Sequence, residues 1–181
     1  MLKVISLAVA TVIIPFANFT HGQASAAAPT HYQISQNTTQ SAGISYDRIG
    51  VGKVRLSMSE TQVRKILGKP VKVVDGFLGI IGKTRTLTYS GITVYLGQGS
   101  QPGSFNVYEI KANISRYATP DGIKIGDNEE KLMKIYGKVE PSQNGDLTQY
   151  NYSIEKPSPT SLIFTVKNGK VIEIHCLDVL A

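Results

Sequence analysis

The sequence predicts an α+β fold, in which two helix-plus-antiparallel-sheet repeats pack into one longer sheet with the helices on one face. Three observations lead to this prediction. A 16-residue segment recurs 69 positions further along the chain, both copies carry a helical pattern of apolar residues, and both are followed by alternating apolar and polar residues. The composition of the 181 residues, 41% hydrophobic and 18% charged, is typical of a compact soluble domain.

The N-terminus predicts a secretory signal peptide at residues 1–26. Lys3 supplies a positive charge, residues 4–19 are mostly apolar, and Ala-Ser-Ala at 24–26 offers the small residues of a cleavage site. Only eleven residues of the apolar run precede Pro15, whereas a membrane-spanning helix needs about 20. We therefore expect an exported protein, periplasmic or extracellular, with no transmembrane span in the mature chain. A signal that is kept as an anchor is the alternative.

The next segment, residues 27–48, is rich in Gln, Ser, Thr and Asn and has no apolar period, which predicts a flexible leader. The two repeats follow, the first at residues 49–118 and the second at residues 119–181. Each is too short to bury much core alone, so we expect them to pack side by side.

Each copy of the repeated segment, at residues 54–69 and 123–138, predicts a short capped helix of about nine residues. Ser59 in the first copy and Asn128 in the second stand where an N-cap belongs, and each copy ends in a Gly-Lys pair that places glycine just after the helix. Pro70 closes the first copy from outside the helix.

Strict alternation after each helix predicts half-buried antiparallel strands. The expected strands are residues 85–89, 92–96 and 107–110 in the first repeat and residues 148–154, 162–166 and 171–174 in the second. Asn168-Gly169 predicts a tight type I′ hairpin in the second repeat. The first repeat has a longer, Gly-rich loop at residues 97–106 in the same place.

The helical segment resembles the small helix-plus-sheet module of the SmpA/OmlA (BamE-like) outer-membrane lipoproteins. The resemblance lies in Ser-Met-Ser-Glu at residues 57–60 and Ile-Leu-Gly-Lys-Pro at residues 66–70, and the tandem arrangement is similar to the beta-lactamase inhibitory protein fold. The chain differs from these lipoproteins in that no lipobox cysteine follows the predicted signal. In addition, the second copy has Val139 where the first copy has Pro70. The resemblance implies binding of proteins or envelope components without catalysis.

An enzyme is not expected, because no nucleophile, metalloprotease, Walker or dinucleotide motif is present. We expect no catalytic residue, no metal site and no cofactor. The alternation of the last strand predicts that Ile172, Ile174 and Cys176 are buried and that His175 points outward beside Glu173. His175 and Glu173 form either a pH-sensitive binding pair or an ordinary solvated pair.

Positive charge is concentrated at residues 53–85, which carry a net charge of +6. Lys72, Lys83 and Arg85 in this stretch are candidates for binding an acidic protein or another anionic envelope component, and a membrane surface is a further candidate. Nucleic acid is not expected as a partner because the chain is predicted to be exported. A merely solubilising surface is the alternative.

Phe77, Leu78, Ile80 and Ile81 stand among three glycines between the first helix and the first clear strand. Two interpretations remain open. Either these side chains lie exposed on a hairpin loop and contact a partner or membrane, or residues 77–81 form a buried strand.

The sheet face opposite the helices is predicted to be polar, with Tyr95 as its one aromatic anchor. Its expected members are Thr86, Thr88, Thr93, Tyr95, Glu109, Lys111, Gln149, Asn151, Thr165, Glu173 and His175. The sequence thus favours an exported, non-catalytic binding module. The alternative is an inhibitor of a secreted or periplasmic enzyme that inserts the loop at residues 97–106 into a cleft.

Overall fold

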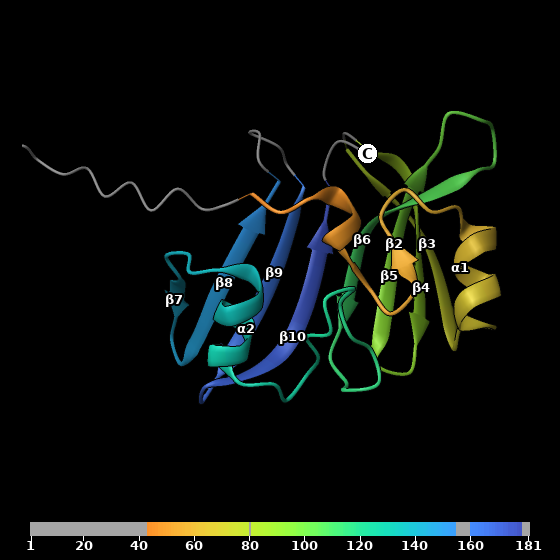
Figure 1. Cartoon of the computed structure of the whole chain (residues 1–181). Helices are drawn as coiled ribbons and strands as arrows, with labels where there is room; N and C mark the ends of the chain where they lie inside the picture. The colour runs from red at the N-terminus through yellow and green to blue at the C-terminus, as the bar shows by residue number, and fades with distance from the viewer. Residues whose placement is uncertain (1–42, 80, 155–159, 179–181) are drawn as a thin grey trace, which may run out of the picture. The chain divides into compact units, whose positions relative to one another are not determined.

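The computed structural model describes residues 43–79, 81–154 and 160–178. This part of the chain is α+β, as predicted, with two α-helices, an eight-stranded antiparallel sheet and a separate two-stranded sheet (Figure 1). The predicted signal peptide lies outside the described residues, as does most of the predicted leader. The end of that leader belongs to the folded part, because Ile44 is buried and its N–H donates to the carbonyl of Ser153.

The chain begins its folded part with a 3-10 helix, η1 (Tyr46–Arg48), and the two-stranded sheet of β1 (Gly50–Val51) and β2 (Val54–Arg55). Helix α1 (Glu60–Leu67) is followed by β3 (Lys72–Leu78), β4 (Gly82–Tyr89), β5 (Ile92–Gln98) and β6 (Phe105–Ala112). Helix α2 (Glu129–Tyr136) is followed by β7 (Ser142–Asn144), β8 (Leu147–Ser153), β9 (Ser161–Lys167) and β10 (Lys170–Leu177).

The strand order of the large sheet is β3-β4-β5-β6-β10-β9-β8-β7, with every neighbouring pair antiparallel. Strands β6 and β10 meet at the centre, where Lys111 stands opposite His175. Strand β3 therefore forms one edge of the sheet and the three-residue β7 forms the other.

Both helices start and end where their capping residues place them. The Ser59 side chain accepts a hydrogen bond from the Gln62 backbone N–H, and the Gln62 side chain accepts one from the Ser59 backbone N–H. The Asn128 side chain caps α2 by accepting from the Lys131 N–H at 2.9 Å. A glycine with positive φ follows each helix, 82° at Gly68 and 87° at Gly137, a conformation that favours glycine.

One row of the sheet shows how the strands share a buried face. Cross-strand partners in this row are all almost completely buried, and the row consists of Leu87, Val94, Ile110, Cys176, Leu162 and Tyr152. Helix α2 packs onto this face through Tyr136, whose ring centroid lies 5.3 Å from those of both Tyr152 and Phe164. Val63 of α1 is fully buried in the same core.

Two predictions about strand ends need correction. The ten-residue loop expected at residues 97–106 has six residues, because Gly97 pairs with Asn106 and Gln98 with Phe105. The prediction that Ile172 is buried is wrong. A β-bulge at Ile172 puts Val171 in the buried position and leaves Ile172 37% exposed.

The tight hairpin predicted between the last two strands is present. Lys167 pairs with Lys170, and the two residues between them both have positive φ, 50° at Asn168 and 69° at Gly169.

Candidate functional site

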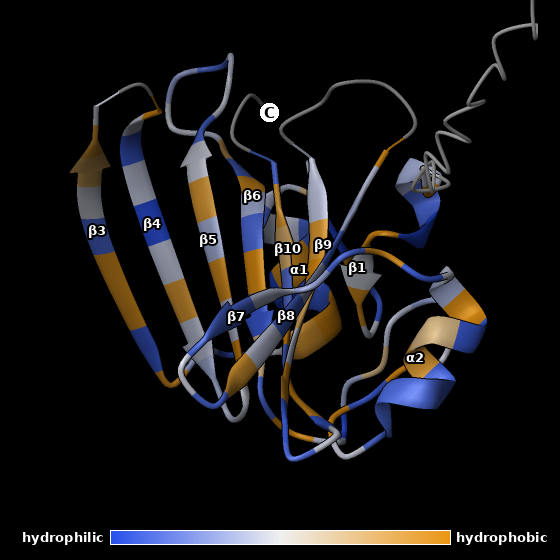
Figure 2. Ribbon diagram, turned by 90° about the vertical axis from the view of Figure 1, so that its left-hand side faces the viewer, coloured by the Kyte–Doolittle hydropathy of each residue, from blue (hydrophilic) through white to orange (hydrophobic). Residues whose placement is uncertain are grey.

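Strand β3 is exposed along its whole length. Within the described residues, five of the eight exposed large hydrophobic side chains lie in or next to this one strand; Figure 2 shows β3 at the sheet edge with hydrophobic segments along it. These five, here termed the β3 surface, are Val71, Val73, Val74, Phe77 and Leu78. Val71 is 81% exposed and Phe77 is 75% exposed. So dense a patch marks a candidate contact site.

The β3 surface is apolar on both faces of the sheet. Val73 stands opposite Leu87, which belongs to the buried face, whereas Val74 stands opposite Thr86 on the polar face. Phe77 shares the face of Val73 by alternation. Strands that are apolar on both faces are typical of the covered interior of a sheet. Here no described part of the chain covers either face of β3, and all seven of its residues are exposed.

The structure decides between the two interpretations of residues 77–81. Phe77 and Leu78 are the last residues of β3, and Ile81 follows in the turn, where its N–H donates to the Leu78 carbonyl at 2.9 Å. Pairing with β4 agrees with the strand interpretation, but burial of Phe77 and Leu78 is wrong. The Ile81 side chain is half-buried and lies over Gly97. Ile80 lies outside the described residues.

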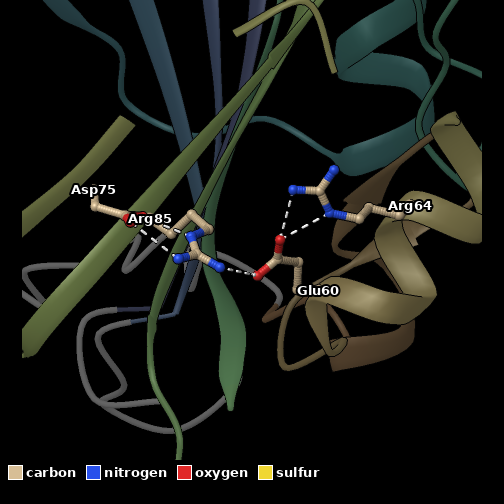
Figure 3. A network of polar contacts seen from close by, with 4 residues as sticks. All are labelled: Glu60, Arg64, Asp75 and Arg85. Carbon is tan, nitrogen blue, oxygen red and sulfur yellow. Dashed lines mark hydrogen bonds and ion pairs between the residues drawn. The ribbon is translucent and has the colours of Figure 1, made fainter. Parts of the chain in front are cut away.

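Arg85 lies at the centre of an ion-pair network rather than on a free basic patch (Figure 3). Its guanidinium donates two hydrogen bonds to Asp75, at 2.6 and 3.0 Å, and a third to Glu60 at 3.0 Å. Glu60 also accepts from Arg64 at 2.8 Å. The hydrogen bonds from Arg85 hold the pKa of Asp75 below its usual range. Arg85 thus ties α1 to β3 and β4.

The other two predicted basic residues keep their charge available. Lys72 in β3 and Lys83 in β4 are exposed, and neither forms an ion pair among the described residues. Lys83 also lines a hollow of about 290 Å³, together with Asp75, Arg85 and Phe105. The β3 surface therefore has uncompensated positive charge next to apolar side chains.

The polar face of the sheet holds a second cluster. The Glu109 carboxylate lies 3.0 Å from the Lys111 ammonium and 2.9 Å from the His175 Nε2. The Lys111 ammonium lies 5.6 Å from the centre of the Tyr95 ring. His175 and Glu173 lie on the same face of β10, as predicted, but the carboxylate that His175 contacts is that of Glu109 on the neighbouring strand.

Glu173 and Tyr95, both predicted as binding residues, line a hollow of about 270 Å³ together with Lys111. Sequence reasoning placed Glu109 on this face but missed it as a site residue, because its contact with His175 depends on the pairing of β6 with β10. Thr165 is predicted to be exposed on this polar face, but in the structure it is buried.

The Glu109 cluster predicts a pH-dependent contribution to stability. Burial raises the pKa of Glu109, but the close approach of His175 and Lys111 outweighs burial and leaves the pKa lowered. A lowered pKa stabilises the fold above the unfolded value of about 4.3, and this stabilisation is lost as the pH falls through the folded pKa. The free energy of unfolding of Glu109→Gln should therefore be lower than that of the wild-type chain at pH 7. The difference between the two free energies should shrink as the pH falls below about 4.

Urea unfolding of both proteins across this pH range checks the prediction, with the exposed Glu140→Gln as the matched control. A difference between wild type and Glu109→Gln that stays constant with pH would contradict it.

The remaining candidate groups are inert or scattered. Burial raises the pKa of the Cys176 thiol to about 12, so the thiol is protonated and buried at neutral pH, as a structural cysteine is. Across the described residues, no group of three or more His, Cys, Asp or Glu side chains could hold a metal ion. The same residues include no helix with the length and hydropathy to cross a membrane.

The fold and the site together define the class of this chain as an α+β domain whose antiparallel sheet offers one long, apolar edge strand among the described residues. No family model, curated protein or solved structure matches the chain.

Proposed function

We propose that the chain is an exported, non-catalytic binding module that engages a protein or another cell-envelope component through the β3 surface. The observation that carries this proposal is that β3 exposes large apolar side chains on both faces at the edge of the sheet. The uncompensated charges of Lys72 and Lys83 beside it favour an anionic partner. Export is supported by the sequence of residues 1–26.

The proposal includes a tandem repeat of a BamE-like module, with both helices on one face of the sheet. Helix α2 begins and ends 69 residues after α1, the same shift that aligns the two sequence copies. Burial of Val63 in α1 and of Leu132 in α2, again 69 residues apart, supports a common helix-bearing face. Both helices are followed by a four-stranded antiparallel meander.

Backbone contacts before the two helices give further support. The Ser57 N–H donates to the Val107 carbonyl at 2.7 Å, and the Gly126 N–H donates to the Val171 carbonyl at 2.8 Å. Ser57 and Gly126 are again 69 residues apart, and each contacts the last strand of its own half, β6 or β10. The two N-cap residues bridge to these same strands.

A capture experiment tests the binding proposal. The purified chain is immobilised, incubated with envelope extract and compared with the double variant Phe77→Ser/Leu78→Ser. Ile172→Ser is the matched control, because it removes an exposed apolar side chain far from β3. We expect the double variant to retain at least tenfold less of the captured component and the control to retain it unchanged. Equal capture by all three would contradict the proposal.

Inhibition of a secreted or periplasmic enzyme is the second candidate function. The loop between β5 and β6 favours it, because the loop extends beyond the strand ends (Figure 1) and is held by its own hydrogen bonds. The Ser104 N–H donates to the Gln101 carbonyl and the Gly99 N–H to the Ser104 carbonyl. If the captured component is a single hydrolase and is lost when residues 99–104 are shortened to Asn-Gly, the inhibitor function is correct instead.

A further inference from the structure

We propose that β3 binds its partner by strand addition, and that the partner is an extended segment with acidic residues flanking a short apolar run. This inference rests on the proposed function, because it states how the β3 surface binds and which chemistry its partner carries.

The backbone of β3 offers a continuous template. Seven residue pairs, from Lys72 opposite Thr88 to Leu78 opposite Gly82, join β3 to β4, and no strand of the described residues lies on its other side. Alternate N–H and C=O groups of an edge strand point away from its neighbour and are free to pair. Seven residues span about 23 Å, enough for a stable register. The opposite edge strand, β7, has only three residues.

The side chains of β3 define what an added strand would cover. A strand about 4.8 Å away would cover Val73 and Phe77 on one face and Val74 and Leu78 on the other. On the face of Phe77, the hollow beside Phe105 has room for one side chain of the partner. A partner segment with apolar residues on both of its faces therefore fits β3 better than a polar one.

Charge selects between an acidic partner and a second copy of this chain. Lys69, Lys72 and Lys83 are exposed around β3 without ion pairs among the described residues, and Asp75 is already neutralised by Arg85. A symmetric antiparallel pair of two copies, centred on Asp75, would place Lys72 opposite Leu78, so neither copy would offer these lysines a carboxylate beyond the Asp75 that Arg85 already holds. An acidic segment gains from the same lysines.

Two blocked peptides with valines on both faces serve as probes, Glu-Val-Val-Thr-Val-Val-Glu and the matched control Lys-Val-Val-Thr-Val-Val-Lys. Calorimetric titration of the full chain in 50 mM salt should show that the acidic peptide binds at least tenfold more tightly. The preference should shrink in 500 mM salt, because salt screens exposed charges. The double variant Lys72→Glu/Lys83→Glu should reverse the preference and bind the basic peptide more tightly than the acidic one. Equal affinities for the two peptides, or no binding of either, would overturn the inference.

Backbone N-methylation separates strand addition from simple side-chain contact. Two versions of the acidic peptide carry N-methyl groups on alternate residues, one on the odd positions and one on the even positions. Strand addition predicts that one version binds like the parent and the other at least tenfold more weakly, because only alternate N–H groups face β3. Equal affinity of the two versions would show that no strand is added.

Failure of this inference is distinguishable from failure of the proposed function. If the peptides do not bind but Phe77→Ser/Leu78→Ser still loses the captured envelope component, strand addition is wrong and the binding module remains. If the double variant captures as much as wild type, the proposed function is wrong. Urea unfolding of each variant shows that lost binding does not come from lost folding. If the free chain instead forms a dimer that Phe77→Ser/Leu78→Ser dissociates, a second copy is the occupant and the acidic-segment inference is overturned.

Discussion

Phe164→Ala is expected to lower the free energy of unfolding by about 3–5 kcal/mol, the largest loss we predict for a single substitution in this chain. Phe164 is fully buried and packs against two aromatic rings, Tyr136 of α2 at 5.3 Å and Tyr152 of β8 at 6.0 Å between ring centroids. Removing its ring leaves a cavity where α2 meets the sheet, and that cavity adds to the lost burial of apolar surface. Urea unfolding measures the change.

Ile163→Ala is the matched control, because Ile163 is the preceding residue of β9 and points to the opposite face, where it is only half-buried. We expect it to cost less than half as much as Phe164→Ala. Equal losses would mean that the face carrying α2 is not the main core of the second half of the chain.

Arg85→Met is expected to destabilise the fold by about 2 kcal/mol. The substitution keeps much of the aliphatic stem but removes the hydrogen bonds to Asp75 and Glu60 and the guanidinium that lies 4.6 Å from the centre of the Phe105 ring. The Glu60 carboxylate, which is mostly buried, would keep Arg64 as its only ion-pair partner among the described residues. Guanidinium chloride is avoided here because its salt screens ion pairs, so urea is the denaturant.

Lys83→Met is the control for Arg85→Met, because Lys83 is an exposed neighbour in β4 without an ion pair among the described residues. Its effect on stability should stay within about 0.5 kcal/mol. If both substitutions cost the same, the network in Figure 3 does not hold β3 against β4 and α1.

The helices could be predicted from the sequence because their signals are local. Ser59 and Asn128 provide the caps, Gly68 and Gly137 provide the ends, and the structure has both helices at the predicted positions. The tight hairpin at Asn168 was equally predictable, since the turn depends on two adjacent residues.

Strand β3 was less predictable because its residues do not alternate between apolar and polar. Val73 and Val74 are adjacent apolar residues that point to opposite faces, so the period-two signal of a half-buried strand is missing. The exposure of Phe77 depends on whether another element covers this edge of the large sheet. The residues near Phe77 in the sequence do not indicate that. This departure from the ordinary pattern is what makes β3 a candidate binding strand.

Two other features depend on strand register. The contact between Glu109 and His175 exists because β6 pairs with β10, although these strands are distant in sequence. The exposure of Ile172 results from a bulge that shifts one residue out of alternation. Neither the register nor the bulge has a local signal in the residues around it, so alternation alone predicted the wrong partner for His175 and the wrong burial for Ile172.

Amide hydrogen exchange of the free chain, followed residue by residue, tests most directly whether β3 is an available edge. We expect a monomer in which alternate amides of β3 exchange rapidly, while the intervening amides, bonded to β4, are protected like those of β5. Uniform protection along β3 would show that its outer edge is already paired and that β3 is not available to a partner.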